Sequence, residues 1–122
     1  MTNPQDIETA DLIKRLESAA EDDQYATIVE CVNYAFGQAW IGQEAWMQAS
    51  RFLEVGAFLD AAMTLVSEGM LYNQGRLSDE RISVSGAKPY HAWVGTQQTV
   101  YASTAALALC TAALRAAEKV TP

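Results

Sequence analysis

The stretch STAALALCTAALRAAEK, residues 103–119, decides the fold. Alanine and leucine are the best helix formers, and the stretch contains no glycine or proline. Ser103 suits the N-cap, and Arg115 and Lys119 suit the negative end of the helix dipole. A helix that is apolar over most of its circumference is normally buried, so we expect the central packing element here. Its two adjacent apolar stripes are Leu107, Cys110, Leu114 and Ala117, and Ala106, Leu109, Ala113 and Ala116.

The composition is that of a globular protein. Of the 122 residues, 50% are apolar and 19% are charged, so residues 1–122 are expected to form a single domain with one core. The formal net charge of −7 disfavours a binder of long nucleic acid, which needs clustered lysine and arginine. It also disfavours adsorption to anionic membranes. A local basic pocket inside an acidic surface stays compatible with this charge.

The cysteines and the N-terminal pattern indicate a cytoplasmic protein. Cys31 and Cys110 are far apart in the sequence, and each lies in an apolar pattern. Free cysteine is among the most buried residue types, so two buried, reduced thiols are expected. No signal peptide is expected, because no basic segment followed by an apolar core opens the sequence. The apolar run at 100–114 is too short for a membrane span.

Residues 1–37 are expected to form an N-terminal helical pair. Asn3 and Pro4 are typical of a helix start, and Gly37 stops the second helix. The acidic run at 21–23 ends the first helix and can cap the second. Apolar residues recur at helical spacing along both helices: Leu12, Ile13, Leu16, Ala19 and Ala20, then Tyr25, Ile28, Val29, Val32 and Phe36.

Residues 53–119 are expected to form a helix–sheet–helix core. Residues 38–52 lack clear periodicity and are expected to connect the two parts; their large aromatics either pin this loop to the core or line a binding surface. A third helix is expected at about 53–67. The pattern then changes to short strands and brief turns, which favours antiparallel pairing: strands at 70–73, 81–85 and 90–94, turns at 74–76 and 86–89, and a lead into the last helix at 96–101.

The predicted fold class is α+β. A short antiparallel three-stranded sheet is flanked by helices, with an N-terminal helical pair and a C-terminal alanine-rich helix. A small sheet must bury its apolar face against helices, and the helices at 53–67 and 103–119 are the best candidates to cover it. The N-terminal pair is expected either to pack outside them or to mediate association. We also expect a homo-oligomer.

Four stretches resemble a known group of proteins. They are DLIKRLESA at 11–19, LDAAMTLV at 59–66, the strand pair Trp93-Val94, and 103–116. Together they resemble small uncharacterised phage and prophage proteins whose core is similar to the phage α-β-α (ABA) sandwich domain. The resemblance covers half to two thirds of the chain and implies one helix, a short sheet and an alanine-rich helix. The group has no catalytic motif to transfer to this sequence.

Residues suited to catalysis are sparse. His91 is the single histidine, so any Ser-His-Asp or Cys-His arrangement has to use it. It lies two residues from Trp93, which places both on one strand face, where a surface or partly buried histidine is the ordinary interpretation. Cys31, Cys110 and His91 lack metal-site spacing, and the glycines form no P-loop or dinucleotide fingerprint. The sequence therefore predicts no enzyme, no cofactor and no metal.

Residues 76–93 combine positive charge with aromatic rings. Guanidinium groups take phosphate oxygens in pairs, and tyrosine or tryptophan rings stack on nucleobases. Such a patch suits a small phosphorylated ligand better than a long polyanion. The ordinary alternative is that Trp93 belongs to the core and the cations are turn residues. The candidate ligand-binding residues, including two from the preceding connection, are Arg76, Arg81, Lys88, Tyr90, His91, Trp93, Arg51 and Trp46.

Three functions follow from the implied phage setting, in which small non-catalytic proteins often act against host defences. The leading hypothesis is a non-enzymatic counter-defence protein of the host cytoplasm that sequesters a nucleotide-like immune signal. The second is an inhibitor of a host defence protein, which docks on a basic surface through its acidic N-terminal face. This face consists of Glu17, Glu21, Asp22, Asp23 and Glu30. The third is an accessory phage protein without a small-molecule ligand.

Overall fold

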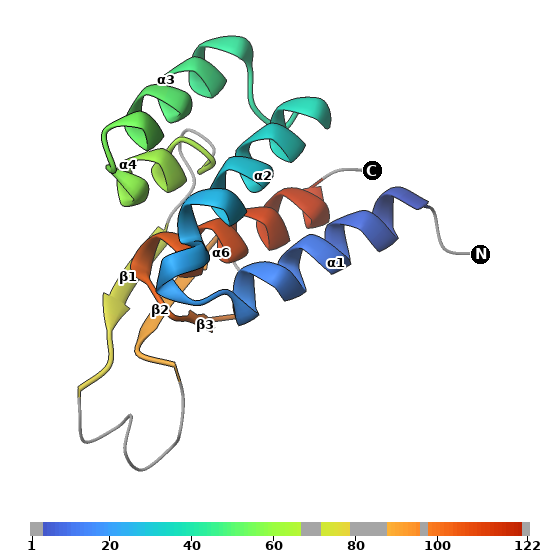
Figure 1. Ribbon diagram of the computed structural model, residues 1–122. Coiled ribbons are helices and arrows are strands. Elements are labelled where there is room, and N and C mark those ends of the chain that lie inside the picture. The colour runs from blue at the N-terminus through green and yellow to red at the C-terminus, as the bar shows by residue number, and fades with distance from the viewer. Residues whose placement is uncertain (1–3, 67–71, 79–87, 96–97, 121–122) are drawn as a thin grey trace.

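The computed structural model describes residues 4–66, 72–78, 88–95 and 98–120 (Figure 1). Within these ranges, helices and a three-stranded antiparallel sheet make an α+β fold, which confirms the predicted class. In chain order the elements are α1 (Pro4–Ser18), the 3-10 helix η1 (Glu21–Asp23), α2 (Gln24–Gly37), α3 (Gln43–Glu54), α4 (Phe58–Met63), β1 (Tyr72–Arg76), β2 (Tyr90–Val94), β3 (Val100–Ala102) and α6 (Ala105–Val120).

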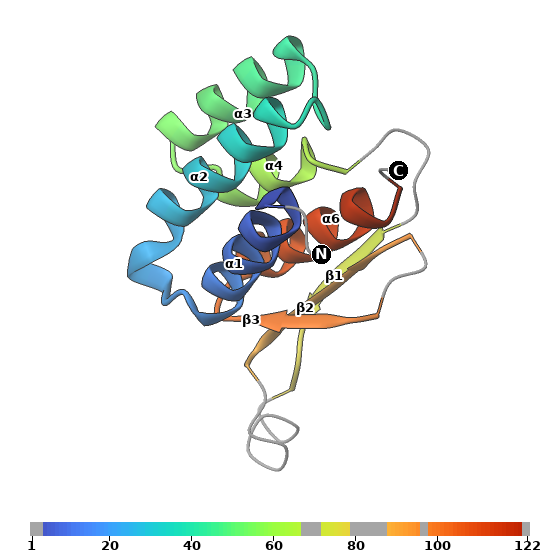
Figure 2. The same ribbon diagram turned by 90° about the vertical axis from the view of Figure 1, so that its right-hand side faces the viewer.

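Helix α6 is the centre of the core, as its sequence predicts. It contacts the three strands on one side and also packs against α1, α2 and α4 (Figure 2). Every residue from 106 to 114 is buried. The predicted N-cap is wrong by one residue: Thr104, rather than Ser103, caps the helix, because its Oγ1 accepts a hydrogen bond from the Leu107 N–H at 3.1 Å.

The sheet has the order β1-β2-β3, with both neighbouring pairs antiparallel. The predicted strand at 90–94 is confirmed, and the one at 70–73 overlaps β1. The turn predicted at 74–76 is wrong, because these residues continue β1 and pair with β2. The segment at 96–101 is more than a lead into the helix, since it contains most of β3. The strand predicted at 81–85 and the first half of the turn at 86–89 lie outside the described residues.

The N-terminal pair is present, with its second helix ending at Gly37, and belongs to the core. Both α1 and α2 contact α6, and α1 also lies beside β3. Leu12 and Leu16 of α1 are buried, as are Ile28 and Val32 of α2. The prediction that the pair packs outside the later helices is therefore only partly correct. Helix α6 lies between the pair and the sheet, but α1 also contacts the edge strand β3 directly.

The segment between the helical pair and the sheet differs most from the prediction. Residues 38–52, expected to be a connection, hold most of α3. The helix expected at 53–67 is wrong as a single element: it contains the end of α3, a turn and the six-residue α4. Helix α4 contacts α2, α3 and α6 but none of the described strands. Covering the sheet therefore falls to α6, with α1 at one edge.

A glycine explains where α3 ends. Gly56 adopts a left-handed backbone with φ of 77°, which glycine reaches without a Cβ penalty. Its N–H donates to the Leu53 carbonyl at 3.2 Å, and the Ala57 N–H donates to the Phe52 carbonyl at 2.8 Å. These two bonds form a Schellman motif, a common helix ending. The chain thus stops one helix at the place where the apolar pattern suggests the beginning of another.

The two cysteines meet in the core. Cys31 and Cys110 are buried and form no disulfide, which confirms the prediction of buried free thiols. Their side chains are hydrogen-bonded between α2 and α6. This bond and the burial raise the pKa of Cys31 well above its ordinary value. The Cys31 thiol therefore stays protonated at neutral pH and is no nucleophile.

Candidate functional site

The sheet divides four of the candidate residues between its two faces. Side chains alternate along a strand, and Ala92 of β2 is buried on the α6 side. Tyr90 shares that face and packs against the core. Its register partner Arg76 on β1 lies on the same face but is exposed. His91 and Trp93 share the opposite face, as the sequence predicts. The patch expected along this segment is therefore not one continuous surface.

The outer face of the sheet carries an aromatic row. His91 lies over Gly75, where an added Cβ would come within 3.1 Å of the imidazole Nε2. On its other side lies Tyr101 of β3, with the ring centroids 6.4 Å apart at an interplanar angle of 61°. Trp93 is partly exposed and is not among the side chains packed against the core cluster. The helices lie on the other side of the sheet (Figure 2).

A pocket of about 290 Å³ lies along β3, next to the end of α1 and to α6. We call it the β3-edge pocket. Two of its residues are well exposed: Tyr101 by 42%, and the side chain of Arg115 by 44%. Its lining residues are Glu17, Gln98, Thr99, Val100, Tyr101 and Arg115.

Two cations converge on Glu17 at this pocket. The Arg115 guanidinium forms an ion pair with the Glu17 carboxylate, and the Lys88 ammonium donates to the Glu17 backbone carbonyl. Glu17 lies in the last turn of α1, where the carbonyl oxygens carry partial negative charge. Lys88 therefore stabilises the end of α1, and Arg115 joins α1 to α6. The Arg115 side chain is still 44% exposed, which leaves donors accessible to a ligand.

Two more candidates lie on α3, away from the sheet. Helix α3 contacts none of the described strands. Trp46 donates from Nε1 to the Asn33 Oδ1 at 2.9 Å and stacks on Phe36, with ring centroids 5.2 Å apart. It lines a depression of about 230 Å³ between α2 and α3, which we call the α2–α3 groove. Arg51 is exposed and is not among the groove's lining residues.

The remaining candidates do not join either pocket. Arg76 is exposed at the end of β1, and its guanidinium donates to the Leu77 carbonyl at 3.1 Å. Arg81 lies outside the described residues. Of the eight candidates, Lys88 touches a lining residue of the β3-edge pocket and His91 contacts another. Of the same eight candidates, only Trp46 is a lining residue of the α2–α3 groove.

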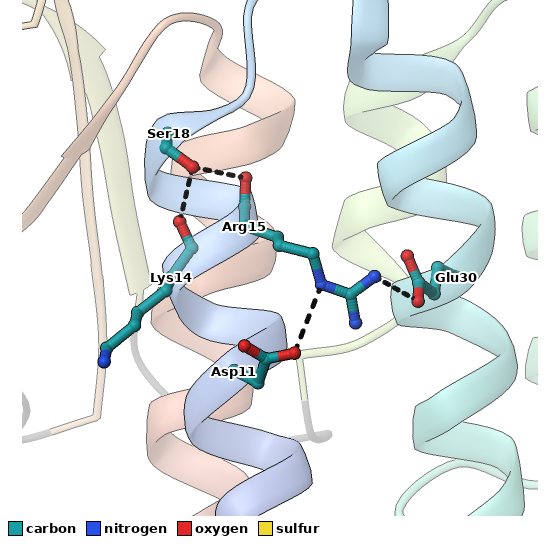
Figure 3. A network of polar contacts seen from close by, with 5 residues as sticks. All are labelled: Asp11, Lys14, Arg15, Ser18 and Glu30. Carbon is teal, nitrogen blue, oxygen red and sulfur yellow. Dashed lines mark hydrogen bonds and ion pairs between the residues drawn. The ribbon is translucent and has the colours of Figure 1, made fainter.

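The acidic N-terminal face is smaller than the sequence suggests. Glu30 is paired with Arg15, whose Nε also lies 3.8 Å from the Asp11 carboxylate (Figure 3). The hydrogen bond to Glu30 raises the pKa of Arg15. Glu17 is paired with Arg115. Two of the five acidic residues are thus engaged within the molecule, and the exposed remainder lies on η1: Glu21, Asp22 and Asp23.

The described residues contain no group of three or more His, Cys, Asp or Glu side chains that could hold a metal ion. In the same ranges, no helix has both the length and the apolar character needed to cross a lipid bilayer. The side chains gathered at the two depressions offer charge, aromatic surface and hydrogen bonds.

The chain matches no family model, no curated protein and no solved structure. The resemblance to the phage α-β-α sandwich domain therefore stays a prediction.

Sequence reasoning missed most of the β3-edge pocket. Tyr101 and Thr99 belong to a segment expected to be a lead into the last helix, and a three-residue strand is too short to show alternation. The position of Arg115 in the sequence indicates a role at the helix end and carries no sign of its pairing with Glu17 of α1. The α2–α3 groove had a usable signal, because Trp46, Ala49 and Leu53 follow Gly42 at helical spacing.

Proposed function

We propose that this chain is a non-enzymatic binding protein that holds a small phosphorylated, nucleotide-like ligand in the β3-edge pocket. The observation that carries the proposal is that Arg115, whose side chain is 44% exposed, and Tyr101, which is 42% exposed, line the same pocket. Guanidinium binds phosphate oxygens in pairs, and a tyrosine ring offers a stacking surface for a base.

The other lining groups suit the rest of such a ligand. Thr99 and Gln98 offer hydroxyl and amide groups, which can bond to sugar hydroxyls or base edges. Glu17 accepts one of the five guanidinium N–H groups of Arg115. It therefore competes with a phosphate for that donor and favours ligands that also bring hydroxyl or N–H donors to the carboxylate.

Size and charge both favour a small ligand over a polymer. The pocket volume of about 290 Å³ is at the lower end for small-molecule sites. The formal net charge of −7 repels a long polyanion, because the many phosphate contacts of nucleic acid need clustered cations. A mononucleotide needs fewer cations: Arg115 lines the pocket, and Lys88 bonds to the backbone carbonyl of the lining residue Glu17.

The biological form of the proposal is counter-defence: a phage protein in the host cytoplasm that removes a nucleotide-like immune signal by binding it. Sequestration needs affinity and no turnover.

Calorimetric titration with 3′,5′-cyclic AMP, 3′,5′-cyclic GMP and ADP-ribose tests the proposal. At least one should bind, and Arg115→Gln should weaken that binding by roughly tenfold or more, as expected for a lost charge-assisted hydrogen bond. Arg51→Gln is the matched control, because it removes the same charge from an exposed site outside the pocket. Silent titrations with all three, or equal weakening by both variants, would contradict the proposal.

The exposed acidic residues of η1 favour a second candidate, an inhibitor that docks on a basic host defence protein. Glu21, Asp22 and Asp23 are all exposed. A complex formed there should weaken as salt rises, and Asp22→Lys with Asp23→Lys should abolish co-purification with the host protein. Glu44→Lys, on α3, serves as the control, and an unchanged complex in the double variant would exclude this candidate.

A further inference from the structure

We propose that the α2–α3 groove binds a small organic cation, a primary amine attached to an apolar or aromatic body. The groove has an apolar floor that includes Val32 and Leu53, both buried, an aromatic side chain on each helix, and a carboxylate at its rim. This site is separate from the β3-edge pocket, because α3 contacts none of the described strands.

The aromatic residues stand at opposite ends of the groove. Tyr25 is in the first turn of α2 and rests against Phe58, just beyond the end of α3, with ring centroids 6.2 Å apart. Trp46 lies near the start of α3, bonded to Asn33 of α2. Tyr25 and Asn33 are eight residues apart on one helix, which is roughly 12 Å. The groove is thus long enough for an apolar body with a charged end.

Trp46 is fixed before any ligand arrives. The hydrogen bond to Asn33 at 2.9 Å holds the indole edge, and the stacked Phe36 ring, at an interplanar angle of 22°, covers part of its surface. A side chain held in this way loses little rotamer freedom on binding, so its contact with an apolar body is not offset by an ordering cost. This end of the groove suits the body of the ligand.

The charge at the other end selects a cation. Glu54 is the last residue of α3 and lines the groove. A carboxylate at a helix C-terminus adds to the negative end of the dipole, an arrangement that does not favour the helix. The residues that line the groove include no lysine, arginine or histidine, so an anionic ligand finds no positive charge among them. An ammonium group gains from Glu54, from the helix end and from the ring of Tyr25.

An NMR titration tests this inference with 2-phenylethylamine as the cation and 2-phenylethanol as its neutral counterpart. The three tryptophans give three indole N–H signals, and the spectrum of Trp46→Phe identifies that of Trp46. The amine should shift the Trp46 signal and leave that of Trp93 in place. It should bind about fivefold more tightly than the alcohol, as expected for one partly exposed ion pair.

Matched charge variants of α3 complete the test. Glu54→Gln should lower the affinity for the amine to that of the alcohol, about fivefold. Glu44→Gln removes the same charge from the first turn of the same helix, outside the groove lining, and should leave the affinity unchanged. The inference is wrong if the amine and alcohol bind equally, if neither shifts the Trp46 signal, or if both variants weaken binding alike.

Discussion

Helices α6 and α3 contribute to the molecule in opposite ways. Residues 106–114 of α6 are all buried, whereas α3 buries only Ala49 and Leu53. Helix α6 joins the sheet to α1, α2 and α4, whereas α3 lies at the periphery and forms one wall of the α2–α3 groove. A helix buried on most sides supports the fold, and a helix buried on one side leaves a row of side chains available for recognition.

The largest expected effect of a single substitution is at the centre of α6. Leu109 is fully buried, so Leu109→Ala should lower the free energy of unfolding by about 2–5 kcal/mol through lost burial and a residual cavity. Met47→Ala is the counterpart on α3, where the side chain is 41% exposed, and should change it by no more than about 0.5 kcal/mol. Urea unfolding measures both, and similar losses would remove the contrast between the helices.

The thiol contact between α2 and α6 should make the protein less stable in alkaline solution. The hydrogen bond to Cys110 and burial raise the pKa of Cys31, so the unfolded chain loses this proton at lower pH than the folded protein. The free energy of unfolding is unaffected below the ordinary thiol pKa and then falls by up to about 1.4 kcal/mol per pH unit. Urea unfolding at pH 7.5 and pH 10 should show a smaller loss for Cys31→Ala than for the natural chain; equal losses would contradict this account.

The end of α3 depends on one glycine. Gly56→Ala places a Cβ in a left-handed backbone, with φ of 77° and no steric neighbour within 4 Å, so strain alone should lower the free energy of unfolding by about 1–2 kcal/mol. Gly37→Ala, at the end of α2, also meets no neighbour and lacks the positive φ. It should leave stability equal or raise it by up to about 1 kcal/mol. Thermal unfolding of both variants checks this, and a neutral Gly56→Ala would exclude the proposed ending.

The smallest expected effect concerns the start of α6. Thr104→Ala removes the side-chain oxygen that caps the Leu107 N–H and should lower the free energy of unfolding by about 1 kcal/mol. Ser103→Ala changes the neighbouring hydroxyl, which is outside the observed cap, and should have an effect of less than half that size. Denaturation curves of the two variants decide between the observed cap and the one expected from the sequence.

The sequence predicts the buried helix α6 better than the peripheral helix α3. The apolar circumference at 103–119 can arise in few settings other than a buried helix, so composition was enough to place α6 at the centre. The one-sided pattern of α3 competes with its glutamines and serine, which resemble a loop. The stop signal at Gly56 is masked in the sequence, because Val55 and Phe58 on either side extend an apparent apolar stripe. In the structure Val55 is 78% exposed.

The candidate sites were less predictable than the fold because they depend on contacts between distant residues. His91 and Trp93 share a face, as strand alternation predicts. In contrast, the approach of Lys88 and Arg115 to Glu17 joins three parts of the chain, and no local pattern encodes it. The pairing of Glu30 with Arg15 likewise reduces the acidic face in a way that a count of charges cannot show.

The central position of α6 has a consequence for the order of assembly. It follows every other described element in the chain, yet the apolar faces of α1, α2 and α4 all pack against it. During synthesis these earlier helices emerge from the ribosome before α6 can cover the faces that pack against it. Those faces are therefore exposed until residues 105–120 have been made, and the nascent chain is more vulnerable to aggregation and proteolysis before α6 appears.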